Sequence, residues 1–218
     1  MIERQQPQSS SHKSQEAGYT IIESLVAMIV VSVLMIAIAP VMAFSVATCV
    51  QAKRIEMATQ AAKTYIEALR SEALQQGIKG FPAPSPTAHE LENTPAPTDM
   101  TALYCIDKDE VQGCQANSNQ DLVVQGYYFN NIPANTNTNP ARTGYSLIVR
   151  VYRANSFASG VGSLKTQKDL PAQQGTTSAG LGNLRAPLVE MRTEIGASDR
   201  EGAYNSLCTR INRATGCQ

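Results

Sequence analysis

Glu23 is the residue whose position most demands a chemical role. It stands at the head of an apolar run in which residues 24–52 carry no formal charge. A carboxylate inside a membrane-spanning segment is costly, and such residues usually have a function and an oppositely charged partner. The next Lys or Arg along the chain is Lys53, 30 residues further on. The partner must therefore come from elsewhere, and a free α-amino group would serve if the chain were cut just before Tyr19.

Five cysteines are a second source of chemistry. Cys105/Cys114 and Cys208/Cys217 share a spacing of eight intervening residues, and disulfides persist on the exported side of a membrane. Four cysteines allow three pairings, and sequence alone does not choose among them. We favour Cys105–Cys114 and Cys208–Cys217, because each closes a loop of polar residues. Zinc is the alternative, but neither pair has the usual short ligand spacing or a nearby His. Cys49, near the outer end of the apolar run, is expected to be buried in a helix.

A short acidic cluster, Asp107, Asp109 and Glu110, lies beside the first of these pairs. Calcium takes oxygen ligands of this kind, but the EF-hand pattern is absent. A solvated acidic turn is the favoured interpretation, and calcium binding stays open. The chain has two histidines, and His89 stands alone in a proline-rich stretch. The sequence contains no recognisable catalytic motif. We therefore expect a protein that is not an enzyme, with no metal or other cofactor.

The composition separates two regions that must position these residues. The 218 residues include 18 Lys and Arg against 18 Asp and Glu, so no basic excess marks a nucleic-acid binder, and we expect no nucleic-acid partner. Apolar residues concentrate between positions 19 and 50, whereas residues 77–185 are rich in Pro, Gly, Ser, Thr, Asn and Gln. The composition therefore predicts a soluble domain attached to one membrane segment.

The apolar run is long enough to cross a membrane, because about 20 residues already span the bilayer core. A cleaved secretory signal is disfavoured, since its apolar part is about 7–15 residues long and its leader is basic. Pro40 lies in the middle of the run and removes one intrahelical hydrogen bond. Neighbouring helices often compensate for such a proline in membranes, so its presence alone indicates no function.

Helical periodicity continues beyond the membrane segment, with apolar residues at steps of three or four from Ile55 to Ala73. The pattern predicts one helix over about residues 19–76, with its second half lying on a sheet. Residues 80–100 hold five prolines and predict a connecting loop. Strand patterns follow over 122–129, 145–152 and 188–195. We expect an α+β fold in which the long N-terminal helix packs on a small antiparallel β-sheet of three to five strands.

The N-terminal residues resemble the start of type IV pilins and type II secretion pseudopilins. The superfamily motif is a glycine, an aromatic, a threonine, two aliphatic residues and a glutamate, and this chain reads Gly18-Tyr19-Thr20-Ile21-Ile22-Glu23-Ser24-Leu25. Tyr19 replaces the commoner Phe, and the leader lacks a clear basic excess. The resemblance implies that a prepilin peptidase cuts between Gly18 and Tyr19 and methylates the new amino group. Glu23 then becomes the fifth mature residue and Pro40 the twenty-second, as in the family.

The same resemblance divides the chain into three parts. Residues 1–18 would be the prepilin leader, residues 19–52 the transmembrane and filament-core helix, and residues 53–218 a globular head with an amphipathic helix and an antiparallel sheet. Glu23 would act in assembly, and Pro40 would mark where pilin helices bend or melt in the filament. The implied partners are the prepilin peptidase, other pilins or pseudopilins, the inner-membrane assembly platform and the membrane itself. The head would be exported, and the assembled filament would be periplasmic or on the cell surface.

Within the superfamily, residues 45–62 resemble pseudopilins of cyanobacterial hormogonium polysaccharide secretion. This resemblance implies a pseudopilin or minor pilin of a filament that assists polysaccharide export linked to motility. The alternatives are a type II protein-secretion pseudopilin, a plain single-pass anchor and a filament-tip module that captures DNA or a surface. A DNA-capturing head would need a basic strip, but Arg150, Arg153 and Arg192 are scattered among acidic residues.

Overall fold

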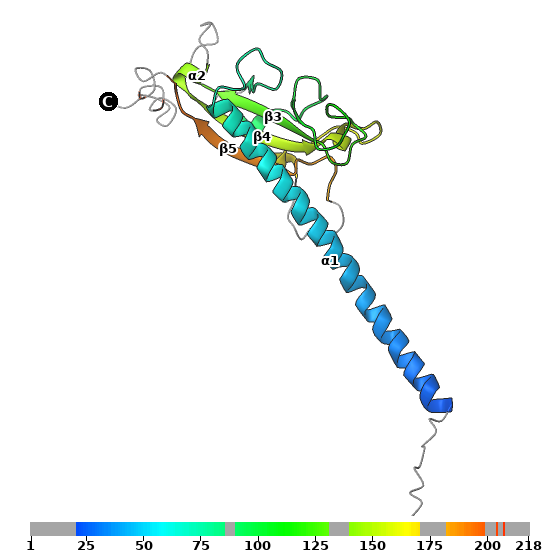
Figure 1. The fold of residues 1–218 in the computed structure, drawn as a ribbon. Coiled ribbons are helices and arrows are strands. Elements are labelled where there is room, and N and C mark those ends of the chain that lie inside the picture. The colour runs from blue at the N-terminus through cyan, green and yellow to red at the C-terminus, as the bar shows by residue number, and fades with distance from the viewer. Residues whose placement is uncertain are drawn as a thin grey trace, which may run out of the picture. The chain divides into compact units, whose positions relative to one another are not determined.

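The computed structural model describes residues 21–85, 90–130, 140–170 and 182–198, together with Tyr204 and Leu207. The chain forms two compact units, one up to Ala43 and the other from Phe44 onward. A single helix, α1 (Ile21–Arg70), supplies the described part of the first unit and the beginning of the second (Figure 1).

The helix ends at Arg70, sooner than the periodicity predicted. Glu72 takes a left-handed backbone conformation with φ of 57°, which a helix does not continue. The N–H of Leu74 turns back to donate to the carbonyl of Ala68. Ala73 and Leu74 keep the apolar spacing of the helix, so the sequence pattern extends past the point where the backbone turns.

The second half of α1 buries a stripe of mostly small residues against the sheet. Alanines at positions 58, 61 and 62 are almost fully buried, as are Tyr65, Ile66 and Leu69. The predicted amphipathic face is therefore confirmed. Tyr65 donates a hydrogen bond from its hydroxyl to the carbonyl of Gly80 at 2.8 Å, and burial raises its pKa. A Cβ at Gly126 would lie 2.4 Å from the same hydroxyl, so only glycine lets the strand approach the helix here.

The sheet has five strands among the described residues. They lie in the order β1-β3-β4-β5, with β2 paired to β3 as well. The three strands predicted from the alternation are confirmed as β3, β4 and β5. The bounds are β1 (Ala83–Pro84), β2 (Tyr104–Ile106), β3 (Leu122–Phe129), β4 (Tyr145–Arg153) and β5 (Val189–Ile195), with the one-turn helix α2 (Pro140–Thr143) before β4.

The sheet is mixed, which corrects the prediction of a purely antiparallel one. The pairs of β3 with β2 and β4, and of β4 with β5, are antiparallel, but β1 pairs with β3 in parallel. The parallel strand has only two residues and contains Pro84, which has no N–H to donate. A proline strand of this kind is tolerated at a sheet edge. Ser85 continues the pairing by donating its N–H to the carbonyl of Tyr128 at 2.8 Å.

Both faces of β4 are buried. Leu147, Val149 and Val151 belong to the core cluster between the sheet and α1. The alternating residues Ile148, Arg150 and Tyr152 are equally buried, although their side chains lie on the opposite face of the sheet. The second face is therefore covered by loops. We call the segment 91–98, which lies over Arg150, the strap.

Candidate functional sites on the helix and the head

The apolar start of α1 contains the predicted assembly residues. Glu23 lies in the first turn of the helix, where the helix dipole favours a negative charge. Pro40 lies inside the helix, which continues on both sides of it. Gly18 and Tyr19, the predicted processing site, lie outside the described residues. Among the described residues, α1 is the helix that is long and apolar enough to cross a membrane.

Hydroxyl side chains within this apolar stretch bond to their own helix. Ser24 donates to the carbonyl of Ile21 at 2.8 Å, and Ser32 donates to that of Met28 at 2.7 Å. Thr48 does the same three residues back, at 2.9 Å. A polar group that is satisfied within its own helix costs little in lipid. These side chains therefore do not argue against a membrane-spanning role.

The prediction that Cys49 is buried is wrong for the isolated chain, where its thiol is free and exposed. The buried face of α1 begins at Gln51 and continues from Ala58. Cys49 precedes that face, and apolar composition alone did not reveal where the contact with the sheet begins.

A disulfide joins Cys105 and Cys114, as the spacing predicted, with 5.7 Å between their Cα atoms. Cys105 lies on β2, so the bridge ties the loop that follows this strand back to the sheet. The second predicted pair, Cys208–Cys217, lies outside the described residues.

The acidic cluster next to this disulfide differs from the predicted one. Carboxylate oxygens of Asp107, Asp109 and Asp121 lie within 4.8 Å of one another, and Glu110 is not a member. Each carboxylate accepts hydrogen bonds from the loop itself, from the N–H groups of Lys108, Asp109, Val111, Gly113 and Gln115 and the hydroxyl of Ser118. The three carboxylates therefore hold the loop in place. Asp121 was missed because its partners are distant in sequence.

Removal of the bridge should loosen this loop and lower the stability of the head. A Cys105→Ala/Cys114→Ala double variant should lose about 2.5–3 kcal/mol, the value expected for a closed loop of roughly ten residues. Thermal unfolding of the full-length protein in detergent would measure the loss. Cys49→Ala is the matched control and should unfold like the wild type, because its thiol is exposed and forms no bridge. Equal stability of the double variant and the control would show that the bridge contributes nothing.

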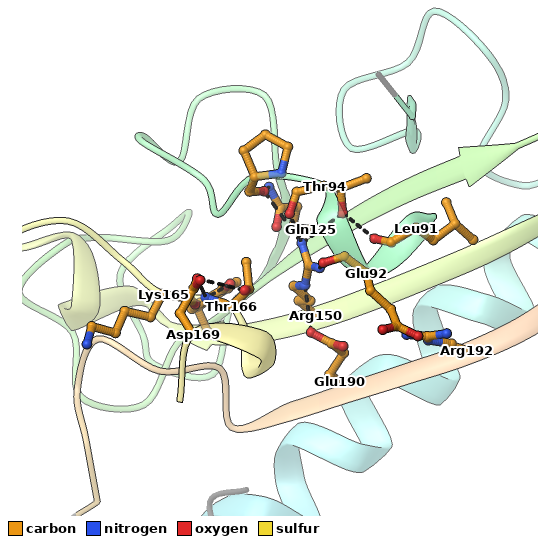
Figure 2. A network of polar contacts seen from close by, with 12 residues as sticks. Leu91, Glu92, Thr94, Gln125, Arg150, Lys165, Thr166, Asp169, Glu190 and Arg192 are labelled. Carbon is orange, nitrogen blue, oxygen red and sulfur yellow. Dashed lines mark hydrogen bonds and ion pairs between the residues drawn. The ribbon is translucent and has the colours of Figure 1, made fainter. Parts of the chain in front are cut away.

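Arg150 is the centre of a polar network on the loop-covered face of the sheet, and Figure 2 shows it between the strap and β5. Its side chain is almost completely buried. Nε donates to the carboxylate of Glu190 at 2.7 Å, and Nη1 donates to the carbonyl and hydroxyl oxygens of Thr94, each at 2.9 Å. Nη2 donates to the carbonyl of Glu92 at 3.2 Å. One guanidinium group therefore fastens the strap to two strands.

Arg192 and Arg153 also contribute to the structure of the head. Arg192 forms an ion pair with Glu92 of the strap. Arg153 is buried, and burial together with the nearby Arg54 lowers its pKa to about 10. The sequence placed Arg150 among acidic residues correctly. It did not reveal that the main partners of Arg150 are backbone carbonyls more than 50 residues away.

Comparison with known proteins is informative for the N-terminal segment. Residues 13–39 match the family model described as the prokaryotic N-terminal methylation motif. This span includes Gly18, Tyr19 and Glu23, and it ends just before Pro40. No curated protein and no solved structure matches the chain.

Proposed function

We propose that this chain, which carries the N-terminal methylation motif that is the signature of type IV pilins and pseudopilins, is a structural subunit of a type IV pilus-like filament. Within that class we assign it to the pseudopilins or minor pilins. The observation that carries the proposal is the motif at residues 13–39, whose described part begins a helix of 50 residues, and the later part of this helix packs on a sheet. This arrangement gives one apolar segment for the membrane or filament core and one folded head.

The proposed path of the subunit follows from these parts. The apolar helix anchors the precursor in the inner membrane as a single pass, with the head on the exported side. A prepilin peptidase removes residues 1–18 and methylates the amino group of Tyr19. The assembly platform then moves the subunit into a filament of other pilins, where the helices stack side by side. Nothing in this path requires the subunit to be an enzyme.

We further propose that the filament assists the export of a polysaccharide and thereby motility. This finer assignment rests on the resemblance of residues 45–62 to pseudopilins of polysaccharide secretion. A type II protein-secretion pseudopilin is the alternative within the same class. Identification of the genes next to this one would separate the two, since glycan-synthesis genes would favour polysaccharide export and secretion-channel genes would favour protein export.

Processing provides the most direct test. We expect cleavage between Gly18 and Tyr19, because the polar leader ends at a glycine directly before the apolar run. Mass spectrometry of the protein extracted from membranes should find Tyr19 at the N-terminus, with a methylated amino group. A Gly18→Glu variant is the control and should keep the leader, because a large charged side chain replaces the small residue at the cleavage site. An intact Met1 in cells with an active prepilin peptidase would contradict the proposal.

A further inference from the structure

The middle of α1 changes from exposed apolar side chains to cations within a few residues. Phe44, Val46 and Val50 are between 38% and 64% exposed. Lys53 and Arg54 follow on the same helix, Lys53 exposed and Arg54 partly buried. We call residues 44–54 the boundary segment. A change of this kind is typical of a helix that leaves the hydrocarbon part of a membrane and enters the layer of lipid headgroups, where Lys and Arg side chains find anionic groups.

The length of α1 agrees with this placement. Lys53 comes 30 residues after Glu23, and both residues belong to the same helix. At about 1.5 Å per residue this is about 45 Å of helix. A bilayer is about 40–45 Å thick when its headgroups are included. With Glu23 at the cytoplasmic headgroups, Lys53 and Arg54 therefore reach the headgroups of the exported side.

The sheet places a third cation beside the boundary segment. Arg153 ends β4 and is buried, and the positive charge of Arg54 adds to the effect of burial in lowering the pKa of Arg153. The fold therefore holds two guanidinium groups near each other at an electrostatic cost. The ion pairs of the described residues include neither Lys53 nor Arg54. An anion supplied from outside the head would offset the repulsion between the two arginines.

The order of apolar and cationic groups selects the class of anion. An anionic phospholipid has acyl chains for the apolar turn of the boundary segment and a phosphate for the cations that follow. A guanidinium group can donate two parallel hydrogen bonds to one phosphate, and an ammonium group pairs with it as a point charge. Free phosphate would neutralise Lys53 and Arg54, but it would leave Phe44, Val46 and Val50 without apolar contacts.

We propose that the boundary segment is a binding surface for an anionic phospholipid of the exported leaflet. The lipid phosphate would accept hydrogen bonds from Lys53 Nζ and from the guanidinium group of Arg54, while the acyl chains lie along the apolar turn before them. This contact would hold the base of the head at the membrane surface until the subunit is extracted. The proposal rests on the membrane anchor of the proposed function and adds the class of lipid that the anchor binds.

Native mass spectrometry of the full-length protein in a nonionic detergent can measure binding of phosphatidylglycerol and of phosphatidylcholine with the same acyl chains. A cation near an anionic lipid surface strengthens binding by roughly fivefold. A Lys53→Gln/Arg54→Gln double variant should therefore lose at least roughly tenfold in affinity for phosphatidylglycerol and change little towards phosphatidylcholine. Lys63→Gln is the matched control and should bind like the wild type. Lys63 is also exposed on α1, but it lies 10 residues beyond Lys53.

Thermal unfolding gives a second readout, which a purely structural role of these side chains would not change. Phosphatidylglycerol should raise the unfolding midpoint of the wild type more than that of the double variant, because a ligand stabilises the state that binds it. Without anionic lipid, Arg54→Gln should unfold no earlier than the wild type, since the change removes the repulsion with Arg153.

Three results would overturn the lipid surface. One is equal affinity of the wild type for the two lipids, and another is the same loss in Lys63→Gln as in the double variant. The third is a double variant that is lost from filaments with its lipid preference unchanged, which would assign the cations to a protein contact. Failure here is separate from failure of the proposed function. Without a lipid surface the chain should still be cleaved before Tyr19, and a chain that keeps Met1 in cells with an active prepilin peptidase could still prefer phosphatidylglycerol.

Discussion

A Glu23→Val variant should be processed and inserted into the membrane like the wild type, yet it should be lost from filaments. A carboxylate costs roughly 2.5–3.5 kcal/mol at the centre of a spanning helix on the insertion scale and less near its end, so valine removes a cost and insertion does not suffer. In the filament the same change would remove one partner of the proposed charge pair with a neighbouring subunit, in a medium of low dielectric constant. Breaking such a pair costs roughly 3–5 kcal/mol, which corresponds to more than a hundredfold loss of affinity between subunits.

The proposed partner of Glu23 in the filament is the new amino group of Tyr19 on a neighbouring subunit. A subunit offset along the filament axis can bring its first residue level with the fifth residue of its neighbour. The pair would then neutralise the carboxylate and also set the axial register between subunits. The amount of the variant in sheared filaments, relative to its amount in membranes, measures the effect.

Glu56→Val is the matched control for this experiment. Glu56 lies on the same helix, but beyond the uncharged run, and its side chain is exposed. The Glu56→Val variant should therefore assemble and support export like the wild type. Wild-type export together with normal recovery of Glu23→Val in filaments would show that the carboxylate is dispensable and that the register mechanism does not apply.

Replacement of Arg150 by methionine should be the most destabilising single change in the head. Methionine fills much of the same space, but it leaves the carboxylate of Glu190 and the carbonyls of Thr94 and Glu92 without their donor. Removal of one partner from a buried ion pair typically costs about 3–5 kcal/mol. Thermal unfolding of the full-length protein should therefore show a clearly lower midpoint, and proteolysis within the strap should be faster.

Arg192→Met provides the comparison. Arg192 also pairs with a strap residue, Glu92, but both side chains are about half exposed. Exposed ion pairs contribute roughly 0–1 kcal/mol, so this variant should unfold close to the wild type. A double variant, Arg150→Met/Glu190→Leu, should regain part of the loss, because no buried charge is left alone. Arg150→Met unfolding no earlier than Arg192→Met would mean that the network does not hold the strap.

The elements of this fold with strong local patterns were predictable from the sequence. Strands β3, β4 and β5 follow runs of β-branched and aromatic residues, and the buried stripe of α1 follows the helical period. The end of the helix was overestimated, since Ala73 continues the apolar spacing while the backbone at Glu72 already turns away. The spacing of apolar residues indicates which side chains are buried, but it does not indicate where the backbone changes direction.

The polar sites of the head depend on partners that are distant in the sequence, so no pattern among neighbouring residues predicts them. Arg150 bonds to Thr94, 56 residues away, and Asp121 accepts from Lys108, 13 residues away. The parallel pairing of β1 was missed for the same reason, because two residues that include Pro84 do not form a recognisable strand pattern. The Cys105–Cys114 bridge was predictable because its two residues are close in sequence and share a spacing with the second pair.

The attachment of the strap by Arg150 has a kinetic consequence. The pairing of β3 with β4 needs only the connection between two consecutive strands, whereas the strap cannot dock until β4 and β5 have both formed. Contacts between residues far apart in the sequence form slowly, because the entropy cost of closing a long loop comes before the contact stabilises the fold. We therefore expect the strap to dock last, after the rate-limiting step. Substitutions at Arg150 should then mainly accelerate unfolding and leave the folding rate unchanged, so that the attachment of the strap sets the lifetime of the folded head.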